Sequence, residues 1–332
     1  MSGNLFLGVD GGGTRTRFVL IGRTGELVAA CEGPTSDHLQ VGIDGVREVL
    51  TDGLAALLRE AQASGSEIAY AFFGLPTYGE DRVAQVLLDG LPERLLGHRR
   101  YRCGNDMIGA WAGSLGGKDG INIVAGTGSI GYGERKGRSA RAGGWGESFS
   151  DEGSAYWIAT QALNSFTRMS DGRLPKGPLY TIFRAHLGLD ADLELCAKLA
   201  NAQSRRSIAA LAQLVAQAAH ERDLSAVRIF DGAARELAAI IEAVRQALKF
   251  EPDEGVPVSY SGGVFEAGEL ILAPLREYIE RHSVNYELKA PILAPSLGAA
   301  IYAARLAARP LSVAAIDRLM AGSVTRSRAP PP

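Results

Sequence analysis

LFLGVDGGGT, residues 5–14, combines a short apolar run with an aspartate and three consecutive glycines. Two further strand-like runs follow at residues 17–21 and 27–32, separated by a turn at residues 23–25, which predicts an antiparallel meander. Three glycines cost a hairpin backbone entropy, so a turn alone does not require all of them. Without Cβ atoms, however, successive N–H groups can approach the oxygens of a phosphate.

The same stretch therefore predicts a phosphate-binding loop. Gly11, Gly12 and Gly13 supply backbone donors, and Thr14 adds a hydroxyl group. Asp10, at the strand end, could hold a hydrated Mg²⁺ ion, since Mg²⁺ binds few protein carboxylates and keeps several waters. The plain alternative is a flexible hairpin, because short motifs produce false matches.

Hydrophobic periodicity extends this pattern into an α/β protein of two similar halves. Apolar residues at three- and four-residue spacing predict helices at 43–61, 83–91, 152–168, 178–187, 208–221, 226–249, 267–282 and 297–309. Short apolar runs predict strands at 68–74, 100–103, 121–125, 130–134, 138–142, 256–261 and 285–288. The strand meander thus begins again near residue 121, which suggests a duplicated architecture with a cleft between its halves.

Length and composition agree with two domains. At about 150 residues per domain, 332 residues give two. We expect an N-terminal domain at 1–116, a C-terminal domain at 117–309 and a partly disordered tail at 310–332. The last helix of the C-terminal domain could pack back on the N-terminal half.

The charge balance and the cysteines exclude several classes of protein. Lys and Arg number 35 against 37 Asp and Glu, which argues against a general nucleic-acid binder. Three separated cysteines give neither a disulfide framework nor a metal-ligand pair. No apolar run approaches the roughly 20 residues that span a bilayer. We therefore expect a cytoplasmic protein with no nucleic-acid or membrane partner.

A second glycine cluster, GTGSIG at 126–131, literally matches the dinucleotide-binding pattern G-x-G-x-x-G. That pattern must open a helix, whereas here a strand and a glycine turn follow. A second phosphate hairpin, with Thr127 as a donor, fits better. A Walker A loop is also absent, since residues 112–119 lack its first glycine and the Ser or Thr after Lys118.

Three other segments carry candidate site residues. Trp145 in the loop at 143–146 and Asp151 before a helix suit a sugar, which has apolar faces and hydroxyl donors. The glycines at 262–263 could admit a flat adenine or form a tight turn. Asp106, after a strand, could orient and deprotonate a hydroxyl nucleophile. Helix capping is the alternative for both aspartates.

The ordered set of motifs resembles the BadF/BadG/BcrA/BcrD ATPase family of the actin–Hsp70–hexokinase superfamily, and within it the N-acetylglucosamine kinases most closely. The resemblance spans residues 5–309. It implies an α/β fold of two ribonuclease-H-like (actin-like ATPase) domains that close over ATP and a sugar. It also implies transfer of phosphate to the 6-hydroxyl of an amino sugar, with ATP and Mg²⁺ as cofactors.

The resemblance assigns roles by position. Phosphates would be bound by Asp10, Gly11, Gly12, Gly13, Thr14 and Thr127, with Asp10 also holding Mg²⁺ through water. The adenosine pocket would be lined by Ala233, Gly262 and Gly263. Asp106 would be the catalytic base. The sugar would contact Asp37, His38, Asn105, Asp106, Ser129, Gly144, Trp145, Gly146 and Asp151.

One position departs from the family pattern. N-acetylglucosamine kinases of this type usually carry asparagine before the histidine in the loop after the third strand, where this chain has Asp37 before His38. A carboxylate can accept from hydroxyls but lacks the amide donor, and it favours a cationic amine. Glucosamine is therefore a competing substrate, alongside N-acetylmuramate or a related hexose.

Alternatives of another class also stay open. One is an ATPase that drives electron transfer, which would need cysteines holding a cluster. Another is a sugar-sensing regulator or a nucleotide-binding protein without catalysis. The sequence leaves a homodimer open.

Overall fold

The computed structural model describes residues 3–200, 204–251, 253–282 and 284–326. These form two compact units, of which unit 1 runs up to Lys118 and resumes at Ala290, while unit 2 comprises Asp119–Lys289. Each unit contains a five-stranded mixed sheet with flanking helices. The predicted α/β fold with two similar halves is therefore confirmed.

Unit 1 has the strand order β3-β2-β1-β4-β5. Its strands are β1 (Leu5–Gly11), β2 (Arg15–Gly22), β3 (Leu27–Pro34), β4 (Ile68–Leu75) and β5 (Tyr101–Asn105). The first three form the predicted antiparallel meander, while β4 and β5 run parallel to β1. The carboxyl ends of β1, β4 and β5 consequently lie at one edge of the sheet.

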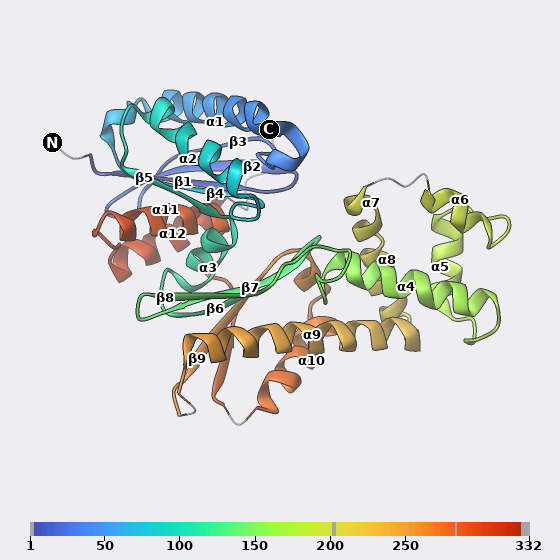
Figure 1. The fold of residues 1–332 in the computed structure, drawn as a ribbon. Coiled ribbons are helices and arrows are strands. Elements are labelled where there is room, and N and C mark those ends of the chain that lie inside the picture. Colours follow the sequence, from blue (N-terminus) through green and yellow to red (C-terminus); the bar gives the residue numbers. More distant parts are fainter. Residues whose placement is uncertain (1–2, 201–203, 252, 283, 327–332) are drawn as a thin grey trace. The chain divides into compact units, whose positions relative to one another are not determined.

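Helices cover both faces of this sheet (Figure 1). One face carries α1 (His38–Ala61) and α2 (Arg82–Leu96), whose leucines join a core with the apolar side chains of β1 and β2. The other carries α11 (Pro295–Leu306), which packs on β1, β4 and α3 (Met107–Leu115). A short 3₁₀ helix, η1 (Gly65–Glu67), precedes β4.

The unit boundary differs from the expected one, because α11 belongs to unit 1. Its Gly298 lies against the backbone of Gly109 and Gly113 in α3, and its start lies over Gly8 in β1. These glycines let two helices and a strand approach at backbone distance. The segment from Ala290 onward therefore joins the first unit, although we expected the second domain to extend to residue 309.

Part of the expected tail is also helical. The helix α12 (Val313–Arg326) buries Ala315, Ile316 and Leu319. The three- and four-residue spacing of these side chains forms an apolar stripe, which the surrounding Arg, Ser and Pro residues obscured. Residues 327–332 of the expected tail lie outside the described residues.

Unit 2 has the strand order β10-β9-β6-β7-β8. Its strands are β6 (Gly120–Ala125), β7 (Ser129–Arg135), β8 (Arg138–Gly143), β9 (Val256–Ser261) and β10 (Tyr286–Lys289). A long helix, α9 (Leu224–Leu248), packs on the β6–β8 meander. Gly131 leaves room on β7 for Ile240, because a Cβ atom there would lie 2.6 Å from that side chain.

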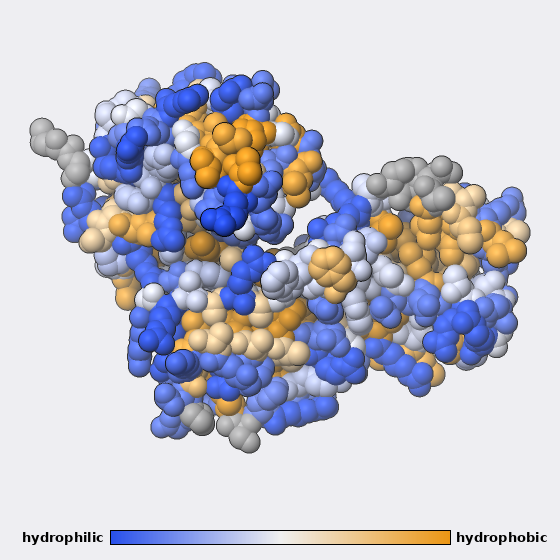
Figure 2. Space-filling view, viewed as in Figure 1, coloured by the Kyte–Doolittle hydropathy of each residue, from blue (hydrophilic) through white to orange (hydrophobic). Residues whose placement is uncertain are grey.

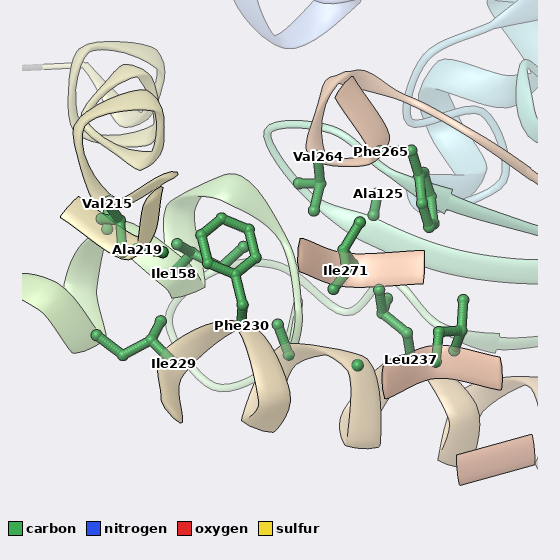
Figure 3. Packing of buried hydrophobic residues seen from close by; sticks show 14 of the residues in the cluster. Ala125, Ile158, Val215, Ala219, Ile229, Phe230, Leu237, Val264, Phe265 and Ile271 are labelled. Atoms are coloured by element: carbon green, nitrogen blue, oxygen red, sulfur yellow. The ribbon is translucent and has the colours of Figure 1, made fainter. Parts of the chain in front are cut away.

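The remaining helices of unit 2 are α4 (Ala155–Ser170), α5 (Pro178–His186), α6 (Glu194–Ala200), α7 (Arg205–Ala210), α8 (Ala212–His220), η2 (Gly263–Ala267) and α10 (Glu269–Glu280). Of these, α4, α8 and α10 pack on α9, while α5 and α7 pack on α4 and α8. Figure 3 shows Phe230 of α9 beside Ile158 of α4, with Val215 of α8 on the same side of the cluster. One continuous core thus joins this helical part to the sheet.

Helix α2 also carries apolar side chains on its outer face. Val83, Val86 and Leu87 are 73%, 72% and 50% exposed, and Figure 2 shows apolar surface in this region of unit 1. The opposite face buries Ala84 and Leu88 in the core. Within the described residues, no helix combines the length and apolar character needed to cross a membrane.

We expect Gly298→Ala to destabilise unit 1 by about 1–3 kcal/mol, because the new methyl group would force α11 away from the backbone of α3. Gly90→Ala is the matched control, since Gly90 lies exposed within α2 and has open space beside it. That substitution should add about 0.5–1 kcal/mol through helix propensity. Urea unfolding of both variants measures the difference, and equal midpoints would contradict the packing argument.

Candidate active site

Two carboxylates meet at the carboxyl edge of the unit 1 sheet. Asp10 ends β1 opposite Gly74 of β4, and Gly74 in turn pairs with Gly104, two residues before Asp106. A Cβ atom on Gly74 would lie 3.2 Å from the Cα of Asp106. Glycine at this position therefore lets the two acidic residues lie close together across β4.

This arrangement disfavours ionisation of both side chains. Burial, and next the charge of Asp106, raises the pKa of Asp10 to about 7. Burial raises the pKa of Asp106 to about 6, and the charges of Glu80 and Asp37 contribute. A pair of carboxylates with raised pKa values is typical of sites that exchange protons or bind cations.

The glycine loop is oriented by the segment that precedes α1. Thr35 donates its hydroxyl to the carbonyl of Gly12 at 2.8 Å, and the side-chain amide of Gln40 donates to the carbonyl of Gly13 at 3.1 Å. In a trans peptide the N–H group points opposite to the carbonyl. The amides of Gly13 and Thr14 therefore point away from α1.

A pocket of about 220 Å³ is lined by the loop residues Gly12, Gly13 and Thr14 together with Asp10, Arg15 and Arg17. Both arginines contact Glu32, with Arg15 at 3.5 Å and Arg17 at 2.8 Å. The pocket thus presents amides and two guanidinium groups beside one carboxylate. This donor set suits a phosphate group together with a hydrated cation.

Asp37 and His38 lie at the start of α1, close to the loop after β4. Asp37 is the N-cap of α1 and accepts from the N–H of Leu39 at 3.1 Å and from Gln40 at 2.8 Å. The hydroxyl of Thr77 lies 3.1 Å from Nδ1 of His38. Among the described residues, Nε2 of His38 and the hydroxyl of Ser36 are buried without a hydrogen-bond partner. Such atoms await a polar ligand or water.

Asn105 acts as a structural residue beside Asp106. Its side chain accepts from the N–H of Met107 at 3.1 Å and donates to the carbonyl of Tyr78 at 3.4 Å. Asp106 occupies the N-cap position of α3 but makes no capping hydrogen bond. Asn105 thus takes the capping role, while the backbone N–H groups of Met107 and Asp106 act to lower the pKa of the Asp106 carboxylate.

A larger pocket, about 790 Å³, lies beside β5 and reaches Asn105. Its carboxylates are already engaged, since Asp89 accepts from the hydroxyl of Tyr78 at 2.7 Å and Glu93 pairs with Arg99 at 2.7 Å. Asp10 and Asp106, whose pKa values are raised, are therefore the better candidates for catalysis than the residues of this pocket.

In unit 2 the second glycine cluster is a hairpin, as predicted, and no helix follows it directly. The carbonyls of Gly126 and Thr127 accept from the first N–H groups of α4, at 2.8 and 3.4 Å. The hydroxyl of Ser129 donates to the carbonyl of Glu152 at 2.7 Å. The hairpin is thereby fixed to the start of α4, with Thr127 exposed.

The loop after β8 requires left-handed backbone at Gly143, Gly144 and Gly146, with φ values of 72°, 70° and 100°. It exposes 72% of Trp145, whose ring lies 5.9 Å from the guanidinium carbon of Arg141. Asp151 has a φ of 60°, is buried, and pairs with Arg205. The loop thus places an open aromatic face and a buried carboxylate in the same unit.

The residues predicted to line the adenosine pocket differ in exposure. Gly262, with a φ of 103°, approaches the backbone of Ala125 and Gly126 so closely that a side chain would collide with it. Gly262 and Gly263 are exposed next to the hairpin, whereas Ala233 is fully buried in the core of unit 2. The side chain of Ala233 therefore faces the core rather than an open pocket.

Several residues of these sites escaped the sequence analysis. Arg15 and Arg17 alternate on β2 next to the glycine loop, a pattern that the sequence shows. Thr77 adopts a left-handed φ of 57°, which no local pattern reveals. Gln40 and Arg205 reach the sites only through tertiary contacts.

A family model described as the BadF/BadG/BcrA/BcrD ATPase family matches residues 7–303. The chain belongs to this family. One curated relative of the chain is the N-acetyl-D-glucosamine kinase of Dictyostelium discoideum, which is 31% identical over 91% of this chain and 98% of that protein. A second relative is the N-acetylmuramic acid/N-acetylglucosamine kinase of Clostridium acetobutylicum, 30% identical over 84% of this chain and 90% of that protein.

Solved structures support the same family fold. A proposed N-acetylglucosamine kinase from Chromobacterium violaceum has a TM-score of 0.72 and 28% identity, over 91% of this chain and 100% of that one. The resemblance to the BadF/BadG/BcrA/BcrD ATPase family and the predicted actin-like fold are thus confirmed. The motif positions lie within the matched range.

For this family member we expect Asp10→Asn to stabilise the fold at about pH 8 while abolishing ATP-dependent turnover. The pKa of Asp10 rises from 3.8 to about 7, so the folded state retains a proton that the unfolded state releases between these values. Asp10 therefore weakens the fold increasingly as pH rises through this window.

Thermal melting from about pH 4 to pH 8 measures the effect. The stabilisation of Asp10→Asn should grow with pH, whereas Asp44→Asn, at a side chain that is 80% exposed, should leave the profile unchanged. A loss of stability at the upper pH would contradict the raised pKa.

Proposed function

We propose that this protein transfers the terminal phosphoryl group of ATP to the 6-hydroxyl of an amino sugar, with N-acetylglucosamine as the favoured acceptor. The observation that carries the proposal is the pair Asp10 and Asp106 at the strand ends of unit 1, beside a glycine loop with two arginines. Curated relatives over most of the chain, named as kinases of amino sugars, support a sugar kinase.

Asp106 is the proposed catalytic base. Its pKa of about 6 leaves it mostly ionised near neutral pH, yet basic enough to take a proton from an attacking hydroxyl. As the sugar oxygen bonds to the γ-phosphorus, the bond to the bridging oxygen of ADP breaks and the hydroxyl proton passes to Asp106. Because the transition state of phosphoryl transfer is loose, the base mainly orients the nucleophile.

Asp10 and the glycine loop are the proposed phosphate and magnesium site. Burial and the charge of Asp106 raise the pKa of Asp10 despite Arg17 and Arg15, and a bound cation would offset both effects. Mg²⁺ would be held through water, and it would neutralise phosphate charge when bound. Among the described residues no three His, Cys, Asp or Glu side chains cluster as a metal site.

The donors at the start of α1 are the proposed sugar contacts of unit 1. The buried hydroxyl of Ser36 and Nε2 of His38, both without a partner among the described residues, suit sugar hydroxyl or acetamido groups. In unit 2, Thr127 is the proposed hydrogen-bond donor to the phosphates of ATP. The proposed sugar contacts are Gly144, Trp145, Gly146 and Asp151. Closure of the two halves over substrate remains a prediction, as does a cytoplasmic location.

Ser129 and Asn105 fit less well as direct sugar contacts. The Ser129 hydroxyl donates to a backbone carbonyl, and both ends of the Asn105 amide are engaged within unit 1. We propose instead that they hold the hairpin and the start of α3 in place. For adenosine, Gly262 and Gly263 remain the proposed surface.

Asp106→Asn should lower kcat by about 10²- to 10⁴-fold while changing the affinities for ATP and sugar little, because the amide is isosteric but cannot take the proton. A coupled assay of ADP release measures kcat, and calorimetric titration measures both affinities. Met107→Leu, at the next residue, is the control for local disturbance. Near-normal turnover in Asp106→Asn would place the base elsewhere.

Asp37 tests the glucosamine alternative. Asn keeps an acceptor for the N–H of Leu39 but cannot also accept from Gln40, so Asp37→Asn should preserve the cap and lower the melting temperature only slightly. It should raise kcat/KM for N-acetylglucosamine relative to glucosamine, since the amide restores a donor and removes a charge that favours the amine. The ratio is measured on a panel that includes N-acetylmuramate. An unchanged ratio would mean that the capping carboxylate does not contact the substituent.

The panel also tests the whole proposal. ADP release that depends on an amino sugar supports it, whereas ATP hydrolysis indifferent to every sugar would overturn it. Iron analysis of the purified protein then distinguishes the electron-transfer alternative.

A further inference from the structure

The Asp151 carboxylate connects three separate segments of unit 2. The backbone N–H groups of Ser129 and Gly146 both donate to it, and Arg205 of α7 donates from Nη2. Its side chain is only 3% exposed. One buried carboxylate thus holds the 126–129 hairpin, the glycine loop after β8 and the start of α7 together.

Arg205 lies directly over the hairpin. A Cβ atom on Gly128 would collide with Nη2 of Arg205 and would lie 2.8 Å from the Asp151 carboxylate. The Nε atom of Arg205 lies 3.3 Å from Glu147, so the guanidinium spans a buried carboxylate and a more exposed one. A planar guanidinium fixes the orientation of a carboxylate in a way that a point charge cannot.

We propose that Arg205 is a positioning residue of this kinase, which orients the Asp151 carboxylate toward the sugar and holds the hairpin at residues 126–129 against the loop at residues 143–146. The sugar part of this inference rests on the proposed function, whereas the contact between Arg205 and Asp151 is a property of the chain. Arg205 and the two backbone N–H groups together take three of the roughly four lone-pair sites of the carboxylate, which leaves one for a hydroxyl donor.

The electrostatics follow from the same contacts. Burial raises the pKa of Asp151, and Arg205 is the largest influence in the opposite direction. Glu147, from the loop, also raises it, while the Glu152 side chain accepts from Ser150 at 3.1 Å. Removing Arg205 would leave burial and Glu147 acting together, so Asp151 would hold its proton to higher pH.

The test compares Arg205→Gln, Arg205→Lys and Glu147→Gln in the full chain, each checked for folding by thermal melting. Carboxyl-carbon NMR titration, assigned with Asp151→Asn, reports the pKa of Asp151 without any need for activity. Steady-state kinetics across pH report the KM for sugar and for ATP.

For Arg205→Gln we expect the pKa of Asp151 to rise by about one unit or more, and the sugar KM to rise about tenfold with the ATP KM nearly unchanged. The acidic limb of kcat/KM should move to higher pH. Arg205→Lys, which keeps the charge but loses the fork, should recover all but about a threefold rise in sugar KM. Glu147→Gln, the matched control that alters only the more exposed partner, should raise neither the pKa nor the sugar KM.

An unchanged Asp151 pKa in Arg205→Gln overturns the proposal whatever the activity. Equal losses for sugar and ATP, without rescue by Arg205→Lys, also overturn it, because they indicate a general structural role. If Arg205→Gln does not fold, a wild-type sugar KM in Arg205→Lys has the same meaning. A raised pKa in a protein that phosphorylates no sugar supports the positioning of Asp151 and refutes the proposed function instead.

Discussion

The close approach of two carboxylates across a glycine is the constraint on which the unit 1 site depends. Parallel pairing of β1 and β5 with β4 brings Asp10 and Asp106 to one edge, and Gly74 removes the side chain that would separate them. Burial and the charge of Asp106 raise the pKa of Asp10, while burial and the charges of Glu80 and Asp37 raise the pKa of Asp106. A bound cation would offset the charges of both groups, which would couple ligand binding to the stability of the fold.

Unit 2 achieves its arrangement by another device. Its loops at residues 126–129 and 143–151, both fully described, are held by hydrogen bonds to backbone groups. The start of α4 binds the hairpin carbonyls, and Asp151 binds the amides of Ser129 and Gly146. Irregular backbone with positive φ values persists only where surrounding contacts determine it. The ion pair between Arg205 and Asp151 therefore helps to hold the loop conformation in addition to balancing the charge of the carboxylate.

The sequence predicted most elements because their patterns are local. Alternation and turn glycines located the two meanders, and apolar spacing located α1, α9 and α11. The short helix α3 was missed, since its small residues are buried on every side and show no periodicity. The predicted helix at 208–221 is interrupted at Leu211, between α7 and α8. The expected packing of the last helix on the N-terminal half agrees with α11 in unit 1, but the end of the second unit was placed too late, because glycine contacts between α11 and α3 are tertiary and leave no signal near residue 290.

The candidate site also contains residues with a local sequence signal and residues that act only through tertiary contacts. Residues that chemistry marks by type and strand-end position, such as Asp10 and Asp106, could be found from sequence. The residues that orient the loops around them could not, because Gln40, Thr77 and Arg205 act through distant segments. The proposed roles of Asn105 and Ser129 also change once their hydrogen bonds are known, since each side chain is engaged inside its own unit. A motif thus identifies which residues matter, and the hydrogen-bond network decides whether each meets the substrate or orients a neighbour that does.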